Sequence, residues 1–267
     1  MADEREPAAG LPVRRQERFN RIVDLLVSSG EVTVTAIASE LKVSTASIRR
    51  DLQLLEEQGL LARTHGGAVA QGVAYELPLR YRTGRQGREK RQIAAEAATR
   101  VSGRQATVGL TGGTTTTEVA RALARHERLT VVTNAINIAS ELVVRPAIKL
   151  VVTGGVARAE SYELCGSMSE EALRRLNLDV AFVGVDGISA AAGLTTHHDE
   201  EAHTNHVMLS RARLVVVVAD STKIGRLAFA RICGVADVDE LITDAAADPT
   251  EVAALEQAGL SVTVLPA

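Results

Sequence analysis

The fold of the N-terminal region is decided by residues 32–69, VTVTAIASELKVSTASIRRDLQLLEEQGLLARTHGGAV. Its segment TAIASELKV (35–43) predicts a short helix with Ile37, Ala38 and Leu41 facing inward. Ser44 is a favourable N-cap and Gly59 a typical helix end, so residues 44–59 predict a second, longer helix. A turn of about three residues separates the two helices, which is the spacing of a helix-turn-helix unit.

The flanking segments complete a small domain, which we expect over residues 14–69. Upstream, RRQERFNRIVDLLVSSG (14–30) repeats apolar residues at spacings of three and four, which predicts a helix that ends before Gly30. The short segment EVTV (31–34) is expected to pair as an edge strand. Downstream, GLLARTHGGAVA (59–70) predicts a β-hairpin wing with Arg63 and His65 at its tip.

The longer helix presents two different faces. Its apolar residues Ile48, Leu52 and Leu55 line the inward face. Small side chains and arginines occupy the rest, with Ala46, Ser47, Arg50 and Gln53 on the opposite side and Arg49 at the flank. Small residues permit close approach to the DNA major groove, and arginine offers forked donors to guanine or phosphate. An ordinary three-helix bundle with solvated arginines is the alternative interpretation.

The ordered string S…IRRDL…LE..G.L.R.HGGA closely resembles the winged helix-turn-helix domain of DeoR-type bacterial transcriptional regulators, over nearly the whole of residues 32–69. Ala46 and Ser47 stand where that family often has a threonine. The resemblance implies that double-stranded operator DNA is the partner. The positions that it places at or near DNA are Ser44, Thr45, Ser47, Arg49, Arg50, Arg63 and His65.

Residues 70–88 are predicted to be a linker, because they lack sustained periodicity and contain Pro78, Gly84 and Gly87. The neighbouring stretch is basic: residues 80–104 hold 8 Lys/Arg against 2 Asp/Glu, whereas residues 105–267 hold 13 against 20. A solvated hinge is the favoured interpretation. The alternative is that phosphate contacts come from Arg80, Arg82, Arg85 and Arg88.

From residue 89 to residue 267, strand-like and helix-like segments alternate. Valine-rich strands such as LTVVT and RLVVVV, without polar alternation, predict a parallel sheet covered by helices on both faces, and hence a larger α/β domain. Ligands of such sheets lie at the carboxyl ends of the strands. At one of these ends, GLTGGTTTTEVA (109–120) supplies backbone N–H groups and hydroxyls at an expected helix N-terminus, which suits a phosphate.

The phosphate carrier is expected to be a small molecule. Neither GxxxxGK[ST] nor GxGxxG occurs, so the sequence does not indicate a nucleoside triphosphate or a dinucleotide. A sugar phosphate fits better, with Asn134, Asp186 and Lys223 as further polar partners. Each strand-end group by itself also has a structural explanation, as a turn residue or a helix cap.

The joint order of GGTT, TN, GG, G.DG and ADS.K resembles the effector domain of the DeoR-type regulators over residues 89–245. The resemblance implies a sugar-phosphate pocket and a fold related to ribose-5-phosphate isomerase and the acyl-CoA transferases. Thr111 stands where the family commonly has aspartate. The implied effector-binding residues are Gly112, Gly113, Thr114, Thr115, Thr133, Asn134, Gly154, Gly155, Asp186, Gly187 and Lys223.

Two other functions, an enzymatic one and metal binding, have some support in the sequence. An isomerase-like enzyme would find its base and electrophile among Asp186, Glu200, Glu201, Asp220 and Lys223, but such an enzyme has no use for a helix that reads DNA. The histidine-rich segment 197–206 lacks an HExxH pattern and is expected to be a polar surface without metal. No catalytic residue, cofactor or metal is therefore predicted.

The sequence predicts a cytoplasmic transcriptional regulator. No apolar run approaches the roughly 20 residues that cross a bilayer, so no membrane partner is expected. We expect a repressor of a sugar or carbohydrate catabolic operon that is relieved by a phosphorylated sugar, acting as a homo-oligomer, a dimer or tetramer. An activator, or a sensor of an unphosphorylated ligand, stays open as an alternative.

Overall fold

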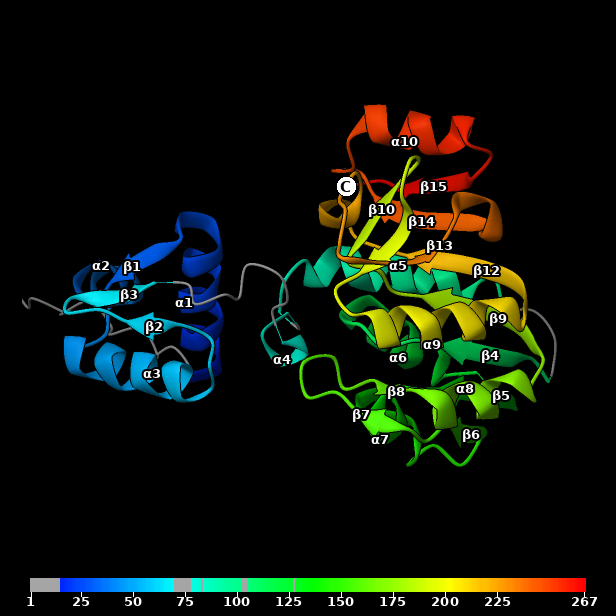
Figure 1. Ribbon diagram of the computed structural model, residues 1–267, viewed down its shortest axis with the longest axis horizontal. Coiled ribbons are helices and arrows are strands. Elements are labelled where there is room, and N and C mark those ends of the chain that lie inside the picture. The colour runs from blue at the N-terminus through cyan, green and yellow to red at the C-terminus, as the bar shows by residue number, and fades with distance from the viewer. Residues whose placement is uncertain (1–14, 70–77, 83, 102–104, 127) are drawn as a thin grey trace, which may run out of the picture. The chain divides into compact units, whose positions relative to one another are not determined.

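The computed structural model describes residues 15–69, 78–82, 84–101, 105–126 and 128–267. The chain divides into two compact units, residues 1–77 and 78–267. The first contains the expected helix-turn-helix and the second the expected α/β domain (Figure 1). Among the described helices, none combines the length and apolar composition that a bilayer-crossing segment requires.

The N-terminal unit has the predicted order of helices and a three-stranded antiparallel sheet, β1-β3-β2. Thr33 ends the first strand and caps the second helix, accepting a hydrogen bond from the Ala36 N–H at 3.3 Å. Ser44 caps the third helix by accepting from the Ser47 N–H at 3.1 Å, as its sequence position predicts. The elements are α1 (Arg15–Ser29), β1 (Glu31–Thr33), α2 (Val34–Leu41), α3 (Thr45–Glu57), β2 (Ala62–Arg63) and β3 (Gly67–Val69).

A buried ion pair joins α1 to α3. Asp51 lies on the inward face of α3 and is 1% exposed. Arg18 of α1 donates to its carboxylate from Nε at 2.7 Å and from Nη2 at 3.2 Å. The sequence did not predict that Asp51 faces inward, because its neighbours Arg49 and Arg50 are exposed and the three residues together form a polar segment.

The C-terminal unit is built on a seven-stranded sheet in the order β15-β14-β12-β9-β4-β5-β6, in which every adjacent pair is parallel. The prediction of a parallel sheet is therefore confirmed. Its strands are β4 (Thr107–Leu110), β5 (Leu129–Thr133), β6 (Ile148–Val152), β9 (Leu178–Val183), β12 (Ala212–Val218), β14 (Glu240–Asp244) and β15 (Ser261–Leu265).

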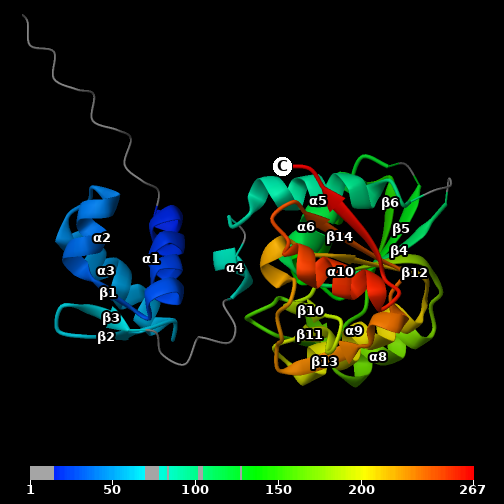
Figure 2. The same cartoon turned by 90° about the horizontal axis from the view of Figure 1, so that it is seen from above.

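Alternate residues of the central strands enter two separate cores. Phe182 and Val216 pack in the core that contains the helix residue Ile93, whereas Ala181 and Val217 pack in the core that contains Met208. Both faces of the sheet are thus apolar and covered, with α5 and α6 over one face and α8 and α9 over the other (Figure 2). The helices of this unit are α5 (Gly87–Ala98), α6 (Thr114–Leu123), α7 (Ile136–Leu142), α8 (Ser167–Arg174), α9 (Asp199–Ser210) and α10 (Pro249–Gln257).

The segment VAFVGVDGI (180–188) is divided between two strands, β9 and β10. The chain leaves the main sheet after Val183 and resumes pairing at Gly187, where a Cβ would lie 2.4 Å from the Arg226 carbonyl oxygen. It then forms a second, three-stranded antiparallel sheet, which was not predicted. That sheet consists of β10 (Gly187–Ser189), β11 (Gly193–Thr196) and β13 (Ala230–Cys233); a further hairpin pairs β7 (Val156–Ala157) with β8 (Leu164–Cys165).

The expected linker, residues 70–88, is shorter in the structure. A one-turn helix, α4 (Leu79–Arg82), belongs to the C-terminal unit, and α5 begins at Gly87. Leu79 and Tyr81 are 4% and 2% exposed, and the Leu79 N–H donates to the Glu160 carbonyl at 2.7 Å. These contacts are too distant in sequence for periodicity to reveal. Residues 70–77 lie outside the described residues.

Replacing Asp51 by alanine should loosen the N-terminal unit, because Arg18 would keep its charge and lose its buried partner. We expect the free energy of local opening of α3 to fall by about 2 kcal/mol, measured by hydrogen exchange of the α3 amides. Glu57→Ala, at an exposed position of the same helix, is the control. Equal exchange in the two variants would contradict this role of Asp51.

Candidate functional site

The predicted DNA-binding residues lie on one exposed part of the N-terminal unit. Thr45, Arg49 and Arg50 of α3 are exposed, and neither arginine has an ion-pair partner among the described residues. Ser44 and Ser47 hydrogen bond to each other through their hydroxyls at 2.9 Å while Ser44 caps the helix. The inward face is apolar as predicted, since Ile48, Leu52 and Leu55 are at most 1% exposed.

The wing carries the other two predicted DNA contacts. Arg63 lies on β2 and His65 at the tip, and both are exposed. The Arg63 N–H donates to a carboxylate oxygen of Glu56 at 2.9 Å, which ties the wing to α3. At Gly67 a Cβ would lie 1.8 Å from the Val32 carbonyl oxygen, so only glycine permits this close approach of β3 to β1. The wing is thus held against the helix-turn-helix.

In the C-terminal unit, the parallel strands bring the predicted effector residues to one edge of the sheet. The carboxyl end of β4 is joined to the carboxyl end of β9, because the Gly184 N–H donates to the Thr111 hydroxyl at 3.0 Å. Thr111 is fully buried and its own hydroxyl donates to the Gly112 carbonyl at 3.3 Å. The residue that replaces the family's usual aspartate is therefore engaged in holding two strand ends together.

The glycine pair that follows β4 leads directly into α6. Gly113 is the N-cap residue of α6 and has φ 125°, a conformation that other residues rarely adopt. The hydroxyls of Thr116 and Thr117 donate to the Gly113 carbonyl at 3.0 and 2.6 Å, which fixes the turn. Gly113 makes no side-chain cap, so the first N–H groups of α6 are open to an anion.

The carboxyl group of Glu163 lies directly over this turn. A Cβ at Gly112 would be 2.3 Å from its Oε1, while Oε2 accepts from the Asn134 amide at 3.1 Å. Burial and the nearby Glu201 raise the pKa of Glu163 to about 8, so this carboxyl is protonated at neutral pH. A neutral carboxyl next to Gly112 does not repel an anion bound at the α6 N-terminus. Glu163 was not predicted as a site residue.

Asp186 is the centre of the second half of the site. Its Oδ1 accepts from Arg82 at 3.0 Å and from Lys223 at 3.2 Å, and its Oδ2 accepts from the Thr196 hydroxyl at 3.1 Å. Burial opposes ionisation of Asp186, but Lys223, Arg82 and His197 outweigh it and hold the pKa at about 2. The carboxylate therefore stays ionised, and the predicted pair Asp186 and Lys223 is brought together.

Further charged groups, absent from the predicted binding set, surround this centre. Lys90 of α5 is 5% exposed; burial lowers its pKa although Asp220 lies 3.6 Å from its Nζ. Arg158 approaches Glu201 at 3.0 Å. Arg82 and Lys90 fall in segments that read as linker and amphipathic helix, so no local pattern identifies them. The feature of the sequence that could have identified Glu163 is its position as an acidic residue directly before an apolar strand.

Other predicted effector residues have packing roles. The Thr133 hydroxyl donates to the Leu110 carbonyl at 2.8 Å and accepts from the Ala135 N–H at 3.0 Å, both inside the protein. A Cβ at Gly155 would lie 2.6 Å from the Cys165 carbonyl oxygen. Asn134 is fully buried, and in the part of the chain that the structure describes its Oδ1 has no hydrogen-bond partner. Effector contacts by Thr133, Gly154, Gly155 and Gly187 remain predictions.

The histidine-rich segment spans the loop after β11 and the start of α9. His197 lies 4.0 Å from Asp186, and burial lowers its pKa. The Nδ1 atom of His203 lies 3.2 Å from the Asp199 carbonyl oxygen, within the same helix. No group of three or more His, Cys, Asp or Glu side chains in the described residues is arranged to hold a metal ion.

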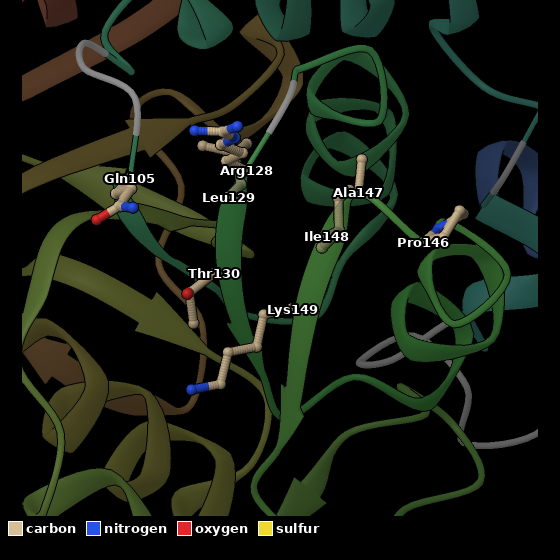
Figure 3. Close-up of a pocket in the computed structure, with 8 residues that line it drawn as sticks. All are labelled: Gln105, Arg128, Leu129, Thr130, Pro146, Ala147, Ile148 and Lys149. Atoms are coloured by element: carbon tan, nitrogen blue, oxygen red, sulfur yellow. The ribbon is translucent and has the colours of Figure 1, made fainter.

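Two hollows flank the C-terminal sheet. One, of about 500 Å³, lies at the amino ends of β4, β5 and β6, opposite the site, and is lined by Gln105, Arg128, Thr130 and Lys149 among others (Figure 3). The other, of about 180 Å³, lies beside the N-terminus of α6 and is lined by Leu79, Thr114, Asn137 and Tyr162 among others. Only the second adjoins the predicted phosphate-binding turn.

Family models match both units. The DeoR-like helix-turn-helix domain matches residues 18–72, and the DeoR C-terminal sensor domain matches residues 85–245, more than half of the chain. The chain belongs to the DeoR family. It thus combines the helix-turn-helix domain of a DNA-binding transcriptional regulator with a sensor domain for a small molecule. Relatives of this chain are named as transcriptional regulators, which favours the regulatory interpretation over the enzymatic alternative.

Named relatives match almost the whole length of this DeoR-family chain. It is 35% identical to the HTH-type transcriptional regulator GlpR of Haloferax volcanii, over 92% of this chain and 96% of that protein. It is 31% identical to the glycerol-3-phosphate regulon repressor of Escherichia coli K12, over 87% and 92%. Among solved structures, ribose-5-phosphate isomerase A of Methanocaldococcus jannaschii is 18% identical, covers 50% of this chain and 52% of its own, and has a TM-score of 0.38.

Glu163→Gln should change how stability depends on pH. The folded-state pKa of Glu163 is raised from its ordinary 4.5 to about 8, so the folded chain holds an extra proton between these values and loses stability as the pH rises. Glutamine removes this titration. The variant's stability relative to wild type should therefore grow from pH 5 to pH 8, by at most about 1.4 kcal/mol per pH unit.

Urea unfolding at four pH values measures this difference. Glu171→Gln, at an exposed position of α8, is the matched control and should follow the wild-type pH dependence. Parallel curves for the wild type and Glu163→Gln would show that Glu163 is ionised in the folded chain.

Proposed function

We propose that the protein represses a sugar or carbohydrate catabolic operon by binding operator DNA, and that a phosphorylated sugar or related metabolite releases it. The observation that carries the effector assignment is the open N-terminus of α6 beside Asp186 and Lys223, at one edge of the parallel sheet. The name of the Escherichia coli relative, a glycerol-3-phosphate regulon repressor, supports the repressor role and the phosphorylated class of effector.

The polar groups of the site match the two parts of such a ligand. Backbone N–H groups at Gly113–Thr115 and the positive end of the α6 dipole suit a phosphate. Asp186, which stays ionised, accepts hydrogen bonds from sugar hydroxyls, while Lys223 donates to their oxygens. Glu163 is neutral and adds a donor next to the phosphate.

On the DNA side, we propose that α3 enters the major groove and that the wing contacts the backbone. Thr45, Ser47, Arg49 and Arg50 lie on the part of α3 nearest its N-terminus, where recognition helices contact bases. The protein is proposed to act as a homo-oligomer, since two copies of α3 bound to a palindromic operator add their binding free energies and so multiply the affinity. Repression rather than activation is proposed; loss of the gene should then raise transcription of the operon.

Arg49→Ala and Arg50→Ala should each abolish sequence-specific binding to the DNA upstream of the regulated genes. Each phosphate contact that is lost should also lower the slope of log K against log salt by about 0.9. Electrophoretic mobility shift over a salt series measures both effects. Arg175→Ala, an exposed arginine of α8 in the other unit, is the control. Specific binding retained by both helix variants would overturn the assignment of α3.

Thr114→Val and Lys223→Gln should each weaken the thermal stabilisation that sugar phosphates confer. Thr114 is the first residue of α6, and Lys223 lies at the other end of the site. We expect affinity losses of about tenfold each, since each variant removes one hydrogen bond to a charged or polar ligand group. The readout is a thermal-shift titration, with Thr250→Val at the start of α10 as the control. Unchanged affinities would place the effector elsewhere.

A further inference from the structure

Along the chain, the short helix α4 lies between the DNA-binding unit and the rest of the sensor domain. It begins at Leu79, immediately after the boundary between the two units at residue 78. Yet α4 is docked on the C-terminal unit by the buried side chains of Leu79 and Tyr81 and by the hydrogen bond from Leu79 to Glu160. Any ligand that moves α4 therefore moves the point where the connection to the DNA-binding unit starts.

Both ends of α4 touch the proposed effector site. Leu79 lines the same cavity of about 180 Å³ as Thr114, the first residue of α6. At the other end, the Arg82 guanidinium donates from Nη1 to Asp186 at 3.0 Å. The site thus includes two residues, Leu79 and Arg82, from a segment outside the predicted effector domain.

Of the two cations that contact Asp186, Arg82 is the one that a ligand can replace more easily than Lys223. Arg82 and Lys223 share the same oxygen, Oδ1. The buried Nε of Arg82 has no hydrogen-bond partner among the described residues, so the guanidinium does not use its two-donor fork on Asp186. Lys223 is anchored, because its N–H donates to the Asp220 carbonyl at 3.0 Å and Asp220 caps its short helix. By contrast, α4 is a single turn of four residues.

We propose that Arg82 is an effector-responsive latch: a hydroxyl of the bound sugar phosphate takes the place of Arg82 on Asp186, and α4 loosens from the C-terminal unit. This inference rests on the proposed function. Effector binding alters DNA affinity only if the ligand distinguishes two arrangements of the protein, and competition for one carboxylate oxygen supplies that distinction. Inorganic phosphate has no carbon-bound hydroxyl and leaves the latch closed.

Hydrogen exchange of residues 78–82, followed by mass spectrometry of the full-length protein, tests the latch without a ligand. The reporter amides are those of Leu79 and Tyr81, which donate to Glu160 and Pro78. In Arg82→Gln they should exchange at least about fivefold faster than in wild type. Arg175→Gln, at an exposed position of the chain just after α8, is the control and should keep the wild-type rate. Equal rates in Arg82→Gln and Arg175→Gln would overturn the proposal.

The ligand arm uses glucose 6-phosphate, fructose 1-phosphate, glycerol 3-phosphate and inorganic phosphate with the wild-type chain. A sugar phosphate that stabilises the protein thermally should also speed exchange in residues 78–82, and inorganic phosphate should not. Thermal stabilisation without faster exchange would overturn the latch and leave the proposed function standing. No stabilisation by any of the three organic phosphates would contradict the proposed effector class, and the latch with it.

A DNA-binding experiment measures how much the bound sugar phosphate changes the affinity for operator DNA. With the stabilising sugar phosphate, wild type should lose operator affinity by a factor within the usual range for allosteric coupling, about 5 to 150. Arg82→Gln should still be stabilised by the ligand, but its operator affinity should change by less than about twofold, because the latch is already open. A response of wild-type size in Arg82→Gln would overturn the proposal.

Discussion

The parallel direction of all seven strands in the main sheet is the constraint on which the C-terminal unit depends. Because of it, residues from the ends of β4, β9 and β12 meet at one edge, although they are far apart in sequence. The same geometry forces polar groups together at that edge, and hydrogen bonds between strand ends, such as Gly184 to Thr111, hold it in place. The proposed site follows from the direction of the strands.

Without a ligand, the charges at this edge neutralise one another. Asp186 is held by Arg82 and Lys223, and Asp220 lies beside Lys90. Buried ions of this kind are costly unless they are paired, so a ligand that takes one partner must replace its interaction. Such a site is suited to sensing, because binding necessarily rearranges a contact that already exists. A catalytic base needs a carboxylate that is free to accept a proton, which Asp186 with a pKa of about 2 is not.

The two units meet different requirements. The N-terminal unit presents Arg49 and Arg50 without ion-pair partners among the described residues, as a surface that binds a polyanion must, and uses Asp51 with Arg18 to hold α3 in place. Residues 105–267, which make up most of the C-terminal unit, hold 13 Lys/Arg against 20 Asp/Glu, which disfavours contact with DNA. Arg82 lies near the start of the C-terminal unit and contacts Asp186 at 3.0 Å.

The sequence by itself determined the helices, the parallel sheet and the exposed faces, because these depend on local periodicity, caps and turns. It also identified the turn at Gly112–Gly113 and the pair Asp186 and Lys223, whose order along the chain is typical of the family. Only the tertiary structure decided which groups face them. Glu163 over Gly112, and Arg82 on Asp186 across 104 positions of sequence, arise from packing between distant segments, and no local pattern records such contacts.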